Sequence, residues 1–466
     1  MAGLFDTLQL GSRSMQAQRH GLDVAGHNLG NVNTPGYARQ RVALAEVGGV
    51  SSSVGFLGAG VDAVGVAAIR DAALETQIQL ETGISGSLSA QEKALYQALA
   101  ALNESLNTNA ASAAEITNGL TKKIGDLFSS FQTLSTSPLS PADRQNVLVA
   151  AEALALEFRN VSARLDRVDG ALAQLAGNEV ETVNQLLDEV SGINDRIVQA
   201  ESRTNTPAHE LRGQLQQKLG ELAGHIPFTL STPAVGGIAL TVDGHTLIAP
   251  AQQPQKLALV TSNNTVAIGI SGQPDALTLS SGSLHGLLET RSTTLTALRA
   301  DIDLLASSLI SSVNQAHSNG FAPDGSTGRA FFAGTTAADI RVSETLTANP
   351  SLLQTSGAQA NASDNATALG LAQLASTPVQ GLNNQTFASF YGGVVSGLGA
   401  TLKGAREQLA TQRAVEGMLA NQREAISGVS IDEELTDMMK FQKAFQASAR
   451  FVSVADELLD AVINLT

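Results

Sequence analysis

The sequence predicts a mainly α-helical protein with a β-rich insertion, in which long helices from both chain ends form a bundle or coiled coil. Apolar residues recur every seven positions near both ends, which is the spacing of packed helices. A helical spacing runs from about residue 141 to 203, with a one-residue slip between Leu175 and Val183. A period of two replaces it between residues 226 and 283. The fold class rests on these three observations.

The first predicted element is a helix over residues 4–32. Thr34-Pro35-Gly36 ends it, because proline cannot continue a helix and glycine permits the turn. Residues 37–70 are rich in Gly and Val and predict a loop with short strands. The apolar seam of the helix, which we expect to act in assembly, consists of Leu8, Met15, Leu22 and Leu29.

Three helices are predicted in the next part of the chain, at about 71–107, 115–135 and 141–203. The third has a strong N-terminal signal, because Ser140 is a favoured N-cap residue and Pro141 fits the first helical position. Its apolar residues step by four and three, which is typical of bundle packing. The first of them are Leu154, Phe158, Val161, Leu165, Val168, Leu172 and Leu175.

A small antiparallel β domain is predicted at residues 226–283. Asp243-Gly244 joins two β-prone runs and is a preferred two-residue hairpin turn. A second hairpin is expected from 256–260 and 265–270, around Ser262-Asn263-Asn264.

Helices return at 284 to about 318 and at about 386–426. The irregular stretch 321–385 between them suits loops and at most one short helix, near 364–374. Ser430 followed by Glu433 is a capping-box pattern that starts the last helix. The seam of that helix, also expected to act in assembly, is Ile431, Met438, Phe445, Val452 and Leu459.

The predicted domain organisation is nested, with the chain ends bracketing the insertion. Both ends carry heptad helices, and residues 1–41 hold four Arg and two Asp whereas 430–466 hold three basic and seven acidic residues. This weak charge complementarity agrees with pairing of the ends. The predicted segments are an N-terminal axial segment (1–60), the first part of a helical domain (61–225), the β domain (226–283), the return part of the helical domain (284–427) and a C-terminal axial helix (428–466).

Composition excludes several classes of function. The 466 residues include 28 Lys+Arg and 43 Asp+Glu, a net charge of −15, which argues against binding to nucleic acid or anionic lipid. Without cysteine there is no disulfide, thiolate nucleophile or Cys-ligated metal site. Only 15% of residues are charged and 4% aromatic, a composition common in secreted, self-assembling bacterial surface proteins. We expect no transmembrane helix and no cleaved signal peptide.

Residues that could carry chemistry are sparse, so we expect no catalytic residue, cofactor or metal. His20 and His27 lie seven residues apart with no third ligand in view. Asp324-Gly325-Ser326 is better interpreted as a turn than as a cation loop. Glu433 and Glu434 are interpreted as solvated first-turn residues that the helix dipole favours.

Two stretches resemble bacterial flagellar axial proteins. The first runs from Asn28 to Gln40 and is similar to the N-terminal signature of rod, hook and hook-associated proteins. The second, Gly428 to Leu459, closely resembles the C-terminus of the FlgK family, and 286–291 with 314–320 resembles its return helix. His27, Gly30, Phe441 and Phe445 depart from the residues common there, and the chain is short for the family, which suggests a reduced outer domain. The residues that carry the axial-family motif are Asn28, Asn31, Thr34, Pro35, Gly36 and Tyr37.

The resemblance implies a structural protein of the junction between flagellar hook and filament. It implies a homo-oligomeric ring between the hook protein and a second junction protein. It also implies type III export without cleavage, an export chaperone at the C-terminal helix, and paired terminal helices lining the export channel. We expect the termini to be disordered in the monomer and to fold on assembly.

Three alternatives remain open at this point. The chain could be another axial protein of the hook or rod, although the long helices between 71 and 203 argue against a hook protein. It could be a secreted wall hydrolase, which would need converging acids or a metal site. It could also be a cytosolic coiled-coil scaffold.

Overall fold

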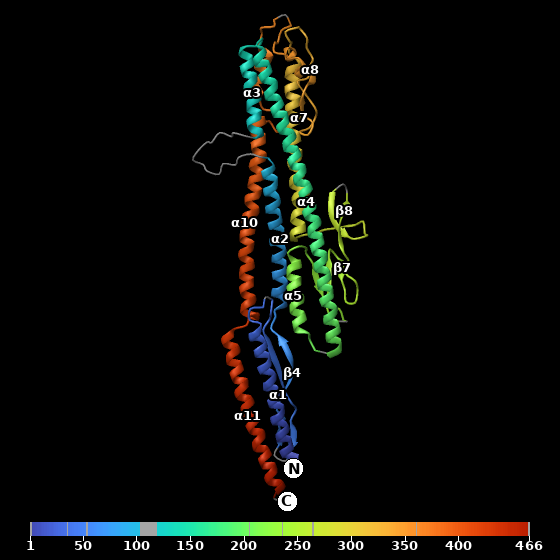
Figure 1. Cartoon of the computed structure of the whole chain (residues 1–466), viewed down its shortest axis with the longest axis vertical. Helices are drawn as coiled ribbons and strands as arrows, with labels where there is room; N and C mark the ends of the chain where they lie inside the picture. The colour runs from blue at the N-terminus through green and yellow to red at the C-terminus, as the bar shows by residue number, and fades with distance from the viewer. Residues whose placement is uncertain are drawn as a thin grey trace.

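The protein is an elongated molecule with both chain ends at one tip (Figure 1). The computed structural model describes residues 2–34, 36–52, 55–102, 119–204, 206–234, 236–262, 265–359 and 361–464. We call residues 72–427 the helical rod and residues 2–68 with 431–464 the terminal unit. The predicted fold class, long terminal helices with an inserted set of small antiparallel sheets, is confirmed.

The terminal unit pairs the first and last helices of the chain. Helix α1 (Ala2–Gly30) lies beside α11 (Ile431–Asn464), and a hairpin of β1 (Gln40–Glu46) and β4 (Val61–Ala68) packs on α1 (Figure 1). Strands β2 (Val50–Ser52) and β3 (Gly55–Leu57) pair between them. The boundary predicted at residue 60 is therefore too early. Strand β4 belongs with β1, and its small residues give only a weak alternation in sequence.

The rod is built around α4 (Pro141–Thr204), whose 64 residues extend about 96 Å at 1.5 Å per residue. Beside it lie α2 (Ala72–Ala101), α3 (Leu120–Thr136), α6 (Gly282–Glu289) and α7 (Thr296–Ser318), and α10 (Phe387–Ser427) packs on α2. The side chain of Asp71 caps α2 by accepting from two backbone amides. A π-helical turn, Thr290–Leu295, joins α6 to α7. The end of the helix predicted at 71–107 and the start of that predicted at 115–135 fall outside the described residues.

The apolar residues that predicted the rod helices form its upper core. Leu, Ala, Ile and Val make up most of this core. Its fully buried aromatic residues are Phe131, Phe158, Phe331, Phe332, Phe387 and Tyr391. The stretch 321–385 closes the far end with β11 (Phe332–Ala333), β12 (Arg341–Val342), α8 (Glu344–Ala348), α9 (Ala366–Gln373) and 3-10 turns at Pro350–Leu352 and Gln380–Leu382. Helix α8 is a second short helix, where at most one was expected, and its single buried residue, Leu346, makes too short a pattern to detect.

The β insertion covers one side of the lower half of α4 (Figure 1). It has two three-stranded antiparallel sheets. One contains β5 (Thr229–Ser231), β6 (Ala239–Val242) and β7 (His245–Ile248), and the other β8 (Leu257–Ser262), β9 (Thr265–Ile270) and β10 (Ala276–Leu277).

Both predicted hairpins are present in these sheets. The Asp243-Gly244 turn has φ of 49° and 79°. Strands β8 and β9 pair as expected, although Asn263 and Asn264 between them fall outside the described residues. A further helix, α5 (His209–Ala223), was not predicted and packs its leucines into the same core.

A buried histidine makes the stability of the rod depend on pH. His317 Nδ1 donates to the backbone oxygen of Arg329 at 2.8 Å, and its Nε2 accepts from the backbone amide of Gln354 at 3.0 Å. The bond from Gln354 requires an unprotonated Nε2 and therefore the neutral ring, and burial lowers the pKa of His317 to about 4. The unfolded chain binds a proton near pH 6.5, so the neutral form stabilises the fold above that pH, and this stability is lost as the pH falls toward 4.

We predict that the free energy of unfolding falls by about 3 kcal/mol between pH 6.5 and 4 because of His317 alone. Urea unfolding at both pH values measures this loss. His317→Gln should remove that part of the pH dependence, whereas the exposed His245→Gln should keep it. Equal pH dependence in wild type and His317→Gln would contradict the assignment.

Candidate assembly site where the chain ends meet

The buried amide of Asn28, at the end of α1, lies at the centre of this site. Its Nδ2 donates to the backbone oxygen of Gln40 at 2.8 Å and to Glu434 Oε2 at 3.0 Å. Its Oδ1 accepts from the hydroxyl of Tyr37 at 2.8 Å and from the backbone amide of Gln40 at 2.9 Å. Asn28 therefore uses its full hydrogen-bonding capacity to connect α1, the following loop, β1 and α11.

Tyr37 keeps its proton in this setting. Burial, followed by the carboxylates of Glu434 and Glu210, raises the pKa of Tyr37 to about 12. Its hydroxyl donates to Asn28, so the Nδ1 of His27, 2.9 Å away, is the donor to the phenol oxygen. The Nε2 of His27 then accepts from Asn31 at 3.4 Å, which fits the same tautomer.

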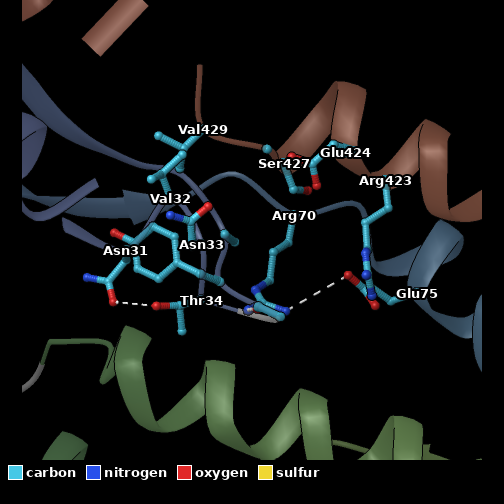
Figure 2. A pocket seen from close by; sticks show the side chains of 14 residues that line it. Asn31, Val32, Asn33, Thr34, Arg70, Glu75, Arg423, Glu424, Ser427 and Val429 are labelled. Carbon is cyan, nitrogen blue, oxygen red and sulfur yellow. Dashed lines mark hydrogen bonds and ion pairs between the residues drawn. The ribbon is translucent and has the colours of Figure 1, made fainter. Parts of the chain in front are cut away.

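The rest of the motif shapes the loop between α1 and β1. Asn31 donates to the backbone oxygen of His27 at 2.9 Å, and Thr34 donates to Asn31 at 3.1 Å (Figure 2). Gly36 has a φ of 75°, a conformation that favours glycine, and its oxygen accepts from Arg70 at 2.8 Å. Pro35 lies outside the described residues. The structure thus brings Asn28, Asn31, Thr34, Gly36 and Tyr37 into one hydrogen-bonded loop.

Arg39 connects the most elements here. It lies in the stretch from Asn28 to Gln40 that resembles axial proteins, but it was not among the residues selected from that motif. Its Nε lies 2.6 Å from Glu434, and its Nη atoms pair with Glu433 and, at 3.5 Å, with Asp437. Its backbone amide donates to the oxygen of Ser427 at 2.9 Å, at the end of α10. Its own oxygen accepts from Ile69 at 2.8 Å, where β4 leads into α2. We call Asn28, Tyr37, Arg39, Glu433 and Glu434 the junction cluster.

The interpretation of both acidic residues as solvated is wrong for Glu434. Its side chain is only 3% exposed, whereas that of Glu433 is 62% exposed, and both pair with Arg39. The helix dipole favours acids in this turn, as expected, but the ion pair to a distant arginine is what places Glu434 inside. The position of Glu434 in the first turn of its helix did not indicate that Arg39 is its partner.

The predicted apolar seams are only partly buried in the contact between α1 and α11. Leu8, Met15, Leu22, Leu29, Met438, Val452 and Leu459 are half-buried, and Ile431 and Phe445 are 49% and 39% exposed. The centre of the contact uses glycines. A Cβ at Gly21 would lie 2.5 Å from the ring of Phe441, and one at Gly11 would lie 2.5 Å from Val452. Small residues on α1 therefore let the two helices approach closely.

Helix α11 exposes apolar side chains along its length, on more than one side of the helix. We call them the open surface of α11. Its members are Ile431, Leu435, Met439, Phe445, Val454, Leu458 and Val462. Exposed apolar side chains at this density on one helix mark an interaction site.

The described residues contain no group of three or more His, Asp or Glu side chains suited to a metal ion. Among the same residues, no helix combines the length and the apolar character needed to cross a membrane. What the arrangement does is hold two helices together by buried polar contacts and present apolar surface outward.

Removing the guanidinium of Arg39 should separate the chain ends. The chain has no cysteine, and Ser14 and Ser448 face each other across α1 and α11 with their hydroxyls 3.0 Å apart. Ser14→Cys with Ser448→Cys should therefore form an intrachain disulfide, visible as a faster band on a non-reducing gel. Adding Arg39→Met leaves Glu434 buried without its partner, which costs about 3–5 kcal/mol, so cross-linking should slow by about tenfold or more.

Two control variants accompany this test. Glu433→Gln changes an exposed partner of Arg39 and should leave the cross-linking rate nearly unchanged. Ser12 lies on the exposed side of α1, so Ser12→Cys combined with Ser448→Cys should give no intrachain disulfide. Unchanged cross-linking in Arg39→Met would show that the junction cluster does not hold the helices together.

Comparisons with known proteins agree with this geometry. The family described as flagellar hook-associated protein FlgK helical domain matches residues 111–332, and that described as flagellar basal body rod FlgEFG protein C-terminal matches residues 420–465. Flagellar hook-associated protein 1 of Bacillus subtilis is 28% identical, with 100% of this chain and 99% of that protein covered. The protein of the same name from Escherichia coli is 24% identical over the full length of both chains.

A solved structure shares the fold. The flagellar hook junction protein FlgK from Burkholderia pseudomallei superposes with a TM-score of 0.65 at 15% identity, covering 75% of this chain and all of that one. The helical rod and the C-terminal helix each match a flagellar family, and the relatives align from end to end. The chain is similar over its full length to hook-associated proteins of the flagellar FlgK family.

Proposed function

We propose that this chain is a structural component of the bacterial flagellum that forms the junction between hook and filament. It does so by self-assembly through the terminal unit. The observation that carries this proposal is the open surface of α11 beside a helix pair closed by the junction cluster. Copies of the same chain would cover that surface. Relatives named flagellar hook-associated protein 1, aligned over the whole chain, support the place in the flagellum.

The terminal unit depends on neighbours for stability. Both hydrophobic cores of the described residues lie in the rod, within residues 90–405, and neither includes a residue of α1 or α11. A helix pair without a core of its own is marginal in water. We therefore propose that both ends are disordered before assembly and fold when neighbouring copies cover the open surface.

The remaining assignments follow from this role. The ring of copies would contact the hook protein on one side and a second junction protein on the other. The terminal helices would line the central channel, the rod would form the next shell, and the β insertion would face outward. Export would occur without cleavage to the cell exterior, with a chaperone holding α11. The proposed role is structural and involves no catalysis.

A rod or hook position is the second candidate, because residues 420–465 match a family named for rod proteins. That match is confined to the C-terminal helix and its approach. The match to the FlgK helical domain covers most of the rod and favours the junction. The two positions predict different structures in cells that lack the gene.

Electron microscopy of cells lacking this gene distinguishes these positions. We expect complete hooks without filaments, and filament protein lost to the medium, because nothing would join the two. Expression of the wild-type gene should restore filaments. Missing hooks would instead place the chain in the rod or hook, and normal flagella would contradict any axial role.

Limited trypsin digestion of the soluble chain tests the disorder of the ends. Cleavage should occur before about residue 45, at sites such as Arg39 and Arg41, and after about residue 425, at sites such as Lys440. The rod between should survive because its helices are packed in two cores. The same ends should resist trypsin in isolated flagella. Equal protection of ends and rod in the soluble chain would contradict coupled folding.

A further inference from the structure

Helix α5 presents one polar face to the terminal unit. His209, Gly213, Gln216 and Gln217 have the spacing i, i+4, i+7 and i+8, which places them on one side of a helix. We call these residues the polar face of α5. A different side of the helix carries the leucines that anchor it in the lower core of the rod. Helix α5 is thus fixed to the rod and faces the terminal unit (Figure 1).

Two residues of this face touch the terminal unit directly. The Nε2 of His209 donates to the backbone oxygen of Val66, in β4, at 2.6 Å. A Cβ at Gly36 would lie 3.6 Å from the Cβ of Gln217, so the loop between α1 and β1, which we call the motif loop, contacts α5 at ordinary van der Waals distance. The contacts hold both the loop after α1 and the hairpin strand β4.

The other two residues of the face position Arg70. Gln216 donates to Glu75 at 3.1 Å, and Glu75 lies 3.9 Å from Arg70 (Figure 2). A Cβ at Gly213 would lie 3.4 Å from Arg70 Nη2, which is contact distance, so a side chain longer than that of alanine would reach into the space of the guanidinium. Thus aligned, Arg70 donates to the oxygen of Gly36 at 2.8 Å.

No hydrophobic core of the described residues crosses this boundary. Instead, two cavities flank the contact, of about 210 Å³ beside Arg70 and Arg423 and about 120 Å³ beside Tyr37 and Gln217. Figure 2 shows the first, between the motif loop and the end of α10. Directed hydrogen bonds at a few points, rather than close packing, therefore set the angle between the two parts.

We propose that the polar face of α5 is a preformed docking surface for the terminal unit, and that it fixes the direction in which the terminal helices leave the rod. This inference rests on the proposed function, because the terminal unit must fold during assembly for a preformed surface to guide it. The occupant is the loop from Asn31 to Arg39 with strand β4 of the same chain. Arg70 is the positioning residue.

The first test places a bulky side chain in the centre of the contact. Gly213→Leu would press on Arg70 and push the terminal unit away, so we expect a several-fold loss of hooks that carry filaments. Gly220→Leu is the matched control, because a Cβ at that glycine of the same helix meets nothing within 4 Å. Both variants should be secreted normally and keep the melting temperature of the rod. Normal filaments on Gly213→Leu cells would overturn the proposal.

The second test measures the contact itself and does not depend on Gly213→Leu folding. The 3.6 Å Cβ separation suits a disulfide, so Gly36→Cys with Gln217→Cys should cross-link within the chain in isolated flagella. It should cross-link several-fold more slowly in the soluble chain, and adding Arg70→Ala should lower the yield in flagella. No cross-link in flagella, or equal rates in both states, would overturn the proposal.

Failure of this inference is distinguishable from failure of the proposed function. If deletion of the gene leaves filaments in place, the junction role itself fails. If deletion removes filaments but Gly213→Leu cells keep them, the chain acts at the junction and only the role assigned to α5 fails.

Discussion

The buried ion pair between Arg39 and Glu434 is the interaction on which the terminal unit depends. It joins residues from opposite ends of the chain, and it lies where α1, β1, α10 and α11 meet. A buried charge without its partner is strongly unfavourable, so each residue requires the other end of the chain to be present. Asn28 and Tyr37 add directed bonds to the same carboxylate and loop, which fix the geometry as well as the pairing.

The rod and the terminal unit are stabilised in different ways. The rod has its own packed cores and a 64-residue helix that spans them. The terminal unit has close helix contact at glycines, a polar cluster and a large uncovered apolar surface. Under the proposed function, the rod would be folded in the single chain and the ends would become ordered only when copies meet.

The sequence predicted the fold well wherever a local pattern carried the information. The step of four and three residues located α4, and the Asp243-Gly244 turn located a hairpin. The motif from Asn28 to Tyr37 was also selected, although its network with Glu434 was not. Helix α5 was missed although Leu211, Leu215, Leu219 and Leu222 recur at helical spacing with polar residues between them, a pattern that could have predicted it. Arg39 lay inside the recognised stretch, but its role was missed because its partners lie at the far end of the chain and no local pattern reports contacts between distant charges. For the same reason Glu434 looked solvated, and the heptad rule placed Ile431 and Phe445 in a seam although both are exposed.

A double-mutant cycle on Arg39 and Glu434 tests the central claim most directly. Arg39→Met, Glu434→Leu and the double variant would be compared in isolated flagella, where the terminal helices are proposed to be folded. The background is Ser14→Cys with Ser448→Cys, and the rate of disulfide formation is the measure of pairing. If the buried ion pair holds the chain ends together, each single variant slows the reaction strongly. The double variant slows it much less than the product of the two single fold-changes in rate, because no charge is left without a partner. Independent, multiplicative effects would show that the two residues act separately and would contradict the account.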